Sequence, residues 1–154
     1  MKNMSTDFKI TCVEEKDMDV LYELYSEFAV YEKLEDYFSA SREEMEKLMF
    51  RDKLLHVLKA EIEGKFVGFA AYYYQLVSFP AKKVLFLEDI FVKEDYRGKG
   101  IGIHFFEELE KIARENDCLK MTWKCLEWNK NSRDFYEHIG AELDEEWVIY
   151  NKVL

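Results

Sequence analysis

The most informative stretch of the chain runs from Val84 to Glu107 and reads V-L-F-L-E-D-I-F-V-K-E-D-Y-R-G-K-G-I-G-I-H-F-F-E. Its first part is apolar except for Glu88 and Asp89, which is typical of a buried strand. A turn with three glycines follows, and beyond it apolar residues recur at spacings of three and four, which predicts an amphipathic helix. The stretch therefore predicts a strand, a glycine-rich turn and a helix in succession.

The glycine-rich turn has the features of an anion-binding site. A helix N-terminus offers N–H groups without intrahelical partners and the positive end of a dipole. Glycines let the backbone approach an anion closely, and Arg97 and Lys99 add positive charge. The turn lacks the Gly-Lys-Ser/Thr ending of a P-loop and the spacing of G-x-G-x-x-G. It is a candidate pyrophosphate site, and the alternative is a tight strand-to-helix turn without a ligand.

Patterns elsewhere in the chain predict the remaining elements. Apolar runs and alternation predict strands at 8–12, 56–61, 65–75, 83–92, 120–126 and 147–153, with a hairpin turn at 63–64. Further helices are predicted after Asp17 as N-cap, after a capping box of Ser41 and Glu44, and from Asn129 to about Ile139. This order predicts a mixed α/β fold in which helices pack on a central sheet.

Length and composition place the chain among globular proteins. With 154 residues, of which 49% are hydrophobic and 35% charged, it is predicted to form one domain over residues 1–154. It has no run of the roughly 20 apolar residues that a membrane span needs, and its polar N-terminus is unlike a secretory signal. We therefore expect a cytoplasmic protein without a membrane partner.

The net charge of −10 bears on the partners of the chain. An acidic protein repels phosphate backbones, so no nucleic acid partner is expected, whereas small cations are attracted. Cys12, Cys118 and Cys125 show no paired spacing and are predicted to be small buried hydrophobic residues without disulfides. The three histidines are scattered, so no metal site is predicted.

Two blocks of the sequence resemble a known family. Residues 97–102, R-G-K-G-I-G, are similar to the Arg/Gln-x-x-Gly-x-Gly/Ala pyrophosphate loop of the GNAT superfamily of acetyltransferases. Residues 129–141, N-K-N-S-R-D-F-Y-E-H-I-G-A, resemble a second segment of that family, N-x-x-(A/S)-x-x-F-Y-x-x-x-G-(F/A). The resemblance implies a mixed, mostly antiparallel central sheet with a splayed strand pair, flanked by helices.

The resemblance also implies acetyl-CoA as acetyl donor and a set of residues that bind it. The strand backbone would pair with the pantetheine, and the turn would hold the phosphates. The implied residues are Ile90, Phe91, Val92, Arg97, Gly98, Lys99, Gly100, Ile101, Gly102, Ile103, Asn129 and Ser132. Tyr136 would place its hydroxyl near the sulfur of the cofactor, and the alternative for Phe135 and Tyr136 is an aromatic pair in the core.

A closer resemblance is to the spermidine/spermine (diamine) acetyltransferases. It is carried by L-E-D-I-F-V at 87–92, D-Y-R-G at 95–98 and E-W-N at 127–129. It implies a small cationic amine as substrate and a homodimer. The substrate-binding residues that it implies are Tyr31, Glu32, Glu88, Asp89, Glu146 and Trp147. Segment 142–147 is shorter than in those enzymes, and the residues after Tyr136 are not basic as they are there.

The chemistry of amine acetylation assigns roles to two of these residues. A primary ammonium must lose a proton before it attacks, and Glu88, an acid in an apolar strand, is the candidate base. The alternative is that Glu88 forms a structural ion pair or points outward. Backbone N–H groups near Val92 would stabilise the oxyanion, and Tyr136 would protonate the departing thiolate. We expect direct transfer in a ternary complex.

Other functions remain open at this stage. The same chemistry would serve a lysine-like amino acid or another small amine. A different class of protein, a non-catalytic acyl-CoA-binding module, would need the glycine-rich turn but not the two candidate catalytic residues. The presence of both Glu88 and Tyr136 favours an enzyme.

Overall fold

The computed structural model describes residues 7–154 and forms two compact units, one that ends at Lys124 and one from Cys125 to Leu154. Residues 1–6, where the sequence predicts no secretory signal, lie outside the described residues. The single domain expected over the whole chain stays a prediction. Among the described residues, no helix is both long enough and apolar enough to cross a membrane.

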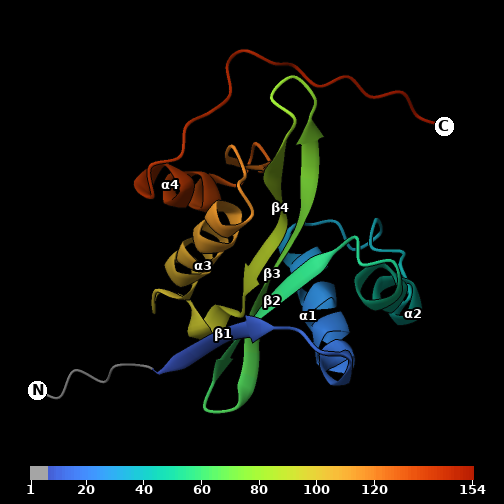
Figure 1. Ribbon diagram of the computed structural model, residues 1–154. Coiled ribbons are helices and arrows are strands. Elements are labelled where there is room, and N and C mark those ends of the chain that lie inside the picture. The colour runs from blue at the N-terminus through green and yellow to red at the C-terminus, as the bar shows by residue number, and fades with distance from the viewer. Residues whose placement is uncertain (1–6) are drawn as a thin grey trace, which may run out of the picture. The chain divides into compact units, whose positions relative to one another are not determined.

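The first unit contains a five-stranded sheet (Figure 1). Its strands are β1 (Phe8–Cys12), β2 (His56–Ile62), β3 (Lys65–Val77), β4 (Lys82–Val92) and β5 (Met121–Trp123), and they lie side by side in chain order. The pairs from β1 to β4 are antiparallel, and β4 and β5 are parallel. The predicted mixed, mostly antiparallel sheet is therefore confirmed, although β5 is shorter than the expected 120–126.

The hairpin between β2 and β3 turns where the sequence places it. Glu63 and Gly64 both have positive φ, at 50° and 77°. Two consecutive residues in this conformation match the right-handed twist of paired strands. The predicted turn at 63–64 is confirmed.

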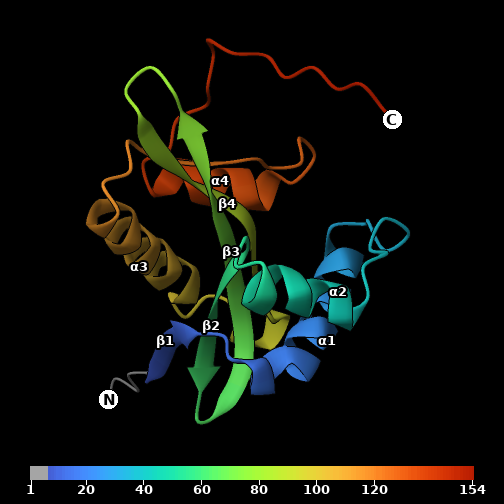
Figure 2. The same ribbon diagram turned by 45° about the vertical axis from the view of Figure 1, so that its right-hand side comes forward.

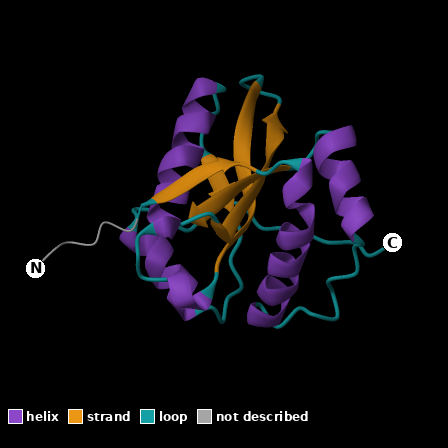
Figure 3. Ribbon diagram, turned by 90° about the horizontal axis from the view of Figure 1, so that it is seen from below, coloured by secondary structure: helices purple, strands orange, loops and turns teal. Residues whose placement is uncertain are grey.

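Helices cover both faces of this sheet. They are η1 (Glu15–Asp17), α1 (Met18–Tyr31), α2 (Arg42–Glu46), η2 (Lys47–Arg51), η3 (Glu94–Tyr96) and α3 (Ile101–Glu115). Helices α1 and α3 lie on opposite faces of the sheet (Figures 2 and 3). Each buries one apolar stripe, with Leu21 and Leu24 of α1, and Phe105 and Leu109 of α3, at most 2% exposed.

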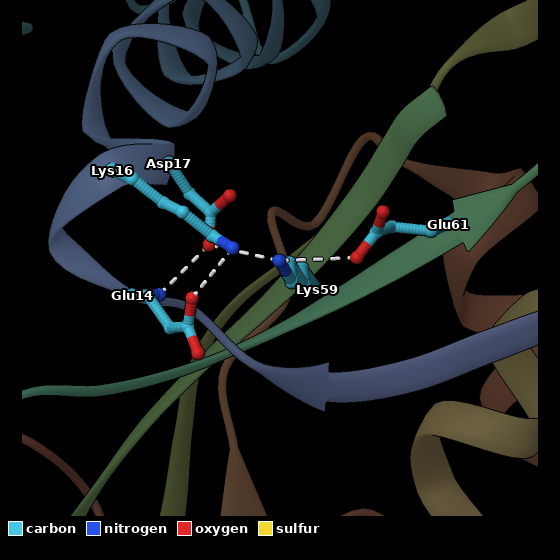
Figure 4. A network of polar contacts seen from close by, with 5 residues as sticks. All are labelled: Glu14, Lys16, Asp17, Lys59 and Glu61. Carbon is cyan, nitrogen blue, oxygen red and sulfur yellow. Dashed lines mark hydrogen bonds and ion pairs between the residues drawn. The ribbon is translucent and has the colours of Figure 1, made fainter. Parts of the chain in front are cut away.

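Helix α1 starts where the sequence predicts, with Asp17 at the N-cap position. The Asp17 side chain, however, does not cap α1: it closes the turn of η1, where its carboxylate accepts the N–H of Glu14 at 2.8 Å. The same Oδ2 atom accepts from Lys59 at 2.9 Å, and Lys59 also contacts Glu61 of β2 at 3.0 Å (Figure 4). Lys59 is only 7% exposed, so this buried cation ties the entry of α1 to the sheet.

Strand β4 contains a bulge at Glu88. Asp89 pairs with Ala71 of β3, whereas Leu87 pairs with the next residue, Tyr72, so Glu88 has no counterpart in the ladder. An extra residue in one strand reverses the alternation beyond it. As a result Asp89 and Phe91 point to the face covered by α1, where Phe91 packs on Phe28 and Phe69 at ring separations of 5.5 and 6.1 Å.

The second unit contains helix α4 (Lys130–His138). Its predicted caps are confirmed: Asn129 Oδ1 accepts the N–H of Ser132 at 3.2 Å, and Gly140 follows the helix with φ of 89°. The strand predicted at 147–153 is wrong, because residues 141–154 form neither helix nor strand. Trp147, Ile149 and Tyr150 are at least 73% exposed, and strand-forming residues alone make no strand without a paired neighbour.

The cysteines also differ from the prediction. Cys12 is exposed, and Cys118 and Cys125 are half-buried. Cys12 ends the edge strand β1, which on one side pairs with no strand of the described residues. The assumption of three buried cysteines was therefore wrong, because it came from residue type and not from position in the sheet.

Candidate functional site

An open backbone edge lies beside β4. Strand β5 pairs with β4 only from Leu85 to Leu87, and no strand of residues 7–154 pairs with this side of β4 beyond the bulge. The N–H of Lys93 donates to Val67 O of β3 at 2.9 Å, so in the alternating antiparallel ladder Val92 and Ile90 point their N–H and C=O groups away from β3. The edge of a splayed strand pair is thus available to an extended ligand.

The three residues expected to meet the cofactor through their backbone are not equivalent. Ile90 and Val92 face the open edge by the alternation just described. Phe91 instead turns its backbone groups toward Phe69 of β3, and its side chain is 6% exposed in the core. In this segment, direct backbone contact with a ligand is therefore open to Ile90 and Val92.

The glycine-rich turn has the backbone conformation that the sequence predicts for it. Gly98 and Gly100 adopt φ of +74° and +84°, which residues with a side chain rarely do. Gly100 is the N-cap of α3, so the N–H groups of the first turn of this 15-residue helix, Ile101 to Ile103, have no partner within the helix. With Lys99 in the same turn, the site combines free donors, a helix dipole and positive charge.

Arg97 lies against the end of β4. Its Nε donates to Val92 O at 2.8 Å, and its guanidinium lies 4.7 Å from the ring centre of Tyr31 and 5.6 Å from that of Phe91. The structure therefore brings Arg97, from the glycine-rich turn, together with Tyr31, which was expected to bind the substrate. Cation–π contacts of this kind are weak enough at exposed positions for the arginine to move to an anion.

Three acidic side chains gather at the bulge. Asp89 accepts a hydrogen bond from Tyr25 OH at 2.8 Å, and Glu88 and Glu32 are close enough for their charges to act on it. Burial raises the pKa of Asp89 to about 6, and the charges of Glu88 and Glu32 add to the rise, while the Tyr25 hydrogen bond opposes it. This carboxyl therefore titrates close to neutral pH.

Glu88 itself is exposed, which corrects the expectation of an acid inside an apolar strand. The reason is the bulge: as the extra residue, Glu88 leaves the alternation that buries its neighbours. Its half-buried neighbour Asp89 is the acid with the perturbed pKa. Tyr25 was missed by sequence reasoning, since its position on the apolar face of α1 marks it only as a core aromatic residue.

Glu32 lies at the C-terminus of α1. It is the C-cap residue, and its N–H donates to Phe28 O at 2.9 Å, which fixes the backbone where the helix ends. Its Oε2 atom is buried. The structure thus brings Glu32 together with Asp89, although they are 57 positions apart in the chain.

The remaining predicted site residues belong to the second unit. Asn129 is 4% exposed and contacts Ser132 as the cap of α4. Tyr136 lies within α4, and its ring centre is 5.8 Å from that of Phe135. Glu146 and Trp147 are exposed, and both N–H groups donate to Asp144 Oδ1, at 2.9 and 3.3 Å.

The open edge, the glycine-rich turn and the two sequence blocks agree with a comparison against known families. Residues 18–141 match the family described as the acetyltransferase (GNAT) family. The chain belongs to this GNAT family. It is accordingly an N-acetyltransferase, and acetyl-CoA is the acetyl donor that GNAT enzymes use.

Individual GNAT relatives are similar over most of the chain. Thialysine N-epsilon-acetyltransferase from Bos taurus is 33% identical over 138 residues, which cover 84% of this chain and 81% of the relative. Spermidine/spermine N(1)-acetyltransferase-like protein 1 from Homo sapiens is 32% identical over 97% of this chain but only 23% of that protein. A solved structure described as a probable acetyltransferase, 24% identical, matches 95% of this chain and 97% of its own with a TM-score of 0.81, which shows the shared fold.

Proposed function

We propose that the chain acetylates a primary amine of a small substrate that carries a second positive charge, such as a diamine or a polyamine. The observation that carries the proposal is the group of three carboxylates, Glu32, Glu88 and Asp89, next to the open edge of β4. Like charges this close raise each other's energy, and a bound cation relieves that repulsion. The net charge of −10 adds long-range attraction for a polycation.

We propose different roles for the acidic residues: one removes a proton from the amine, and the others bind the second ammonium. A primary ammonium has a pKa near 10.4, so a proton must leave before the nitrogen attacks. Glu88 is exposed and adjoins the open edge, and we propose that it takes this proton, directly or through a water molecule. Asp89 and Glu32 then hold the second ammonium. Tyr31 lines the same region through its contact with Arg97.

Backbone groups of β4 and the glycine-rich turn are proposed to bind the acetyl donor. We assign the pantetheine to the edge formed by Ile90 and Val92, and the pyrophosphate to the turn with Arg97 and Lys99 and to the first amides of α3. An N–H group of that edge stabilises the oxyanion as the nitrogen attacks the thioester carbon. The nitrogen then loses its extra proton to water, the carbon–sulfur bond breaks, and Tyr136 donates a proton to the thiolate. The role of Tyr136 rests on its sequence segment alone.

A second candidate is a lysine-like amino acid, favoured by the similarity to the thialysine enzyme. Such a substrate also carries a second ammonium, which suits Asp89. Its carboxylate, however, would be repelled by the three acids. On electrostatic grounds the diamine is therefore the better match.

An amine panel tests the proposal. Purified protein is incubated with acetyl-CoA and putrescine, spermidine, spermine, lysine or thialysine, and thiol release is followed. We expect turnover with the diamine and the polyamines that falls at least about a hundredfold in Tyr136→Phe. Tyr150→Phe is the matched control, since Tyr150 is a 91% exposed tyrosine of the same unit.

The other outcomes separate the alternatives. Turnover with lysine or thialysine alone would keep the acetyltransferase and replace the diamine by the amino acid. Binding of acetyl-CoA without acetylation of any amine in the panel would contradict the proposed substrate class and favour an acyl-CoA-binding module.

A further inference from the structure

One hydrogen bond joins helix α1 to the strand that carries the acidic residues. The hydroxyl of Tyr25 donates to Asp89 Oδ2 at 2.8 Å, across 64 positions of the chain. Both residues belong to the first unit. A phenol that reaches from the core to a carboxylate of the candidate site is not required for packing, because a phenylalanine would fill the same space.

The ring of Tyr25 is held on both sides. It stacks on Phe69 of β3 at a centroid distance of 4.3 Å and on Phe38, from the segment after α1, at 6.1 Å. Phe28 adds an edge contact at 6.4 Å. Since Tyr25 is only 9% exposed, this aromatic packing fixes the position of its hydroxyl oxygen.

The phenol acts only as a donor. Burial raises the pKa of Tyr25 well above its ordinary value, and the neighbouring carboxylates Asp89 and Glu88 raise it further. The hydroxyl therefore keeps its proton at neutral pH. It orients the carboxylate without exchanging a proton with the substrate.

We propose that Tyr25 is a positioning residue whose hydroxyl holds the Asp89 carboxylate in the orientation that receives the distal ammonium of the substrate. The inference rests on the function proposed above. With Oδ2 occupied by the phenol, Oδ1 is the oxygen that meets the cation.

The charged groups around Asp89 support a cation at this position. Glu88 from β4 and Glu32 from the end of α1 both act on Asp89 with negative charge. The guanidinium of Arg97 is engaged with Val92 O and the Tyr31 ring. Among residues 7–154, the titratable groups that act on Asp89 are thus two carboxylates and one phenol, and within that range the phenol alone donates a hydrogen bond to it.

Tyr25→Phe tests the proposal, because it removes the hydroxyl and keeps the ring. A hydrogen bond to a charged group is worth enough to change affinity about tenfold or more. We therefore expect KM for putrescine to rise about tenfold, with kcat and KM for acetyl-CoA unchanged. With n-butylamine, which has no distal charge, kcat/KM stays the same.

Tyr22→Phe is the matched control. Tyr22 lies one turn earlier in α1, and its hydroxyl donates to a backbone carbonyl, Ala40 O, at 2.9 Å. Its loss removes a phenol hydrogen bond of the same helix without touching Asp89, so KM for putrescine should not change. Equal effects of the two variants, or equal effects of Tyr25→Phe on putrescine and n-butylamine, would overturn the proposal.

The pH profile adds a readout that a purely structural role would not move. In the wild type, kcat/KM for putrescine should fall as pH decreases through about 6, where Asp89 becomes protonated. Tyr25→Phe should shift this fall to higher pH, because the carboxylate loses its donor. Asp89→Asn should abolish the fall, and adding Tyr25→Phe to it should change nothing more. An unshifted profile in Tyr25→Phe would contradict the proposal.

Carboxyl-carbon NMR separates this inference from the proposed activity. Putrescine should shift the Asp89 resonance in the wild type, even if no amine is acetylated, and should do so less in Tyr25→Phe at equal concentration. If that variant does not fold, a pH titration of the wild type tests the inference instead. The Tyr25 Cζ resonance should then shift with pH at the same midpoint as the Asp89 carboxyl resonance. A Tyr25 chemical shift that does not change as Asp89 titrates would contradict the proposed role of the phenol.

Discussion

Replacement of Asp89 by asparagine should stabilise the protein while it removes a carboxylate that we propose binds the substrate cation. The carboxyl has a pKa of about 6 in the folded chain against an ordinary value of 3.8. A raised pKa means that the folded state binds the proton more tightly than the unfolded state does, so ionisation of Asp89 weakens the fold. The penalty is absent below about pH 4, grows between pH 4 and 6 and is complete above pH 6.

The size of the effect follows from the same two values. One pKa unit corresponds to 1.36 kcal/mol, so the rise from 3.8 to about 6 corresponds to about 3 kcal/mol at pH 7. Asparagine has nearly the same shape, carries no charge and can still accept the hydrogen bond of Tyr25. For a chain of this size, a gain of about 3 kcal/mol would raise Tm by roughly 6–12 °C.

The assay is urea unfolding of the wild type and Asp89→Asn between pH 4 and 8. The difference in the free energy of unfolding should be small at pH 4, increase toward pH 6 and level off above it. Asp117→Asn is the control: Asp117 pairs with Lys82 but is 84% exposed, and loss of such a surface pair should change stability by less than about 1 kcal/mol. A variant at Asp89 that is less stable at pH 7, or a difference that does not depend on pH, would refute this account of the acidic site.

Three further substitutions test the fold and the turn. Asp17→Asn should lower the free energy of unfolding by about 2 kcal/mol at pH 7. Burial alone would raise the pKa of Asp17, but Glu14 N–H and Lys59 lower it below 3.8, so in urea titrations the loss should be complete above about pH 4 and shrink as pH falls below it. Gly68→Ala should unfold the protein or lower its Tm strongly, as a Cβ there would lie 2.8 Å from a backbone oxygen of β4. Gly100→Ala should cost about 1 kcal/mol, because φ is +84°, and should raise Kd for acetyl-CoA in calorimetry.

The elements that the sequence predicts correctly are those whose signal is local. Helix α4 begins at a side-chain cap and ends at a glycine with positive φ, and both are visible within 12 residues of sequence. The side chain of Asp17 shows the opposite case, since Asp17 stands at the N-cap of α1 but its carboxylate does not cap the helix. Its carboxylate has a partner 42 positions away, Lys59 of β2, and no local pattern shows that competitor for the helix N-terminus.

The residues of the candidate site also fall into those that a local sequence pattern predicts and those that it does not. The glycine-rich turn could be predicted because a positive φ and a helix start both leave a mark on residue type. Tyr25 could not, because every position on one face of α1 is apolar or aromatic and nothing in the sequence tells which ring reaches a carboxylate. Its partner lies 64 positions away in another element.

The bulge at Glu88 connects these observations. If Glu88 were paired in the ladder and the regular alternation of β4 continued past Leu87, the side chains of Asp89 and Phe91 would point away from α1, and Asp89 would not meet Tyr25. The same extra residue shifts the backbone alternation, so that Ile90 and Val92, and not their neighbours, offer N–H and C=O groups to the edge where β5 has ended. A single irregularity in β4 thus sets both the acidic side and the cofactor side of the candidate site. Because a bulge is a property of pairing between strands, the sequence of β4 alone shows two acids in an apolar run and cannot show which of them is buried.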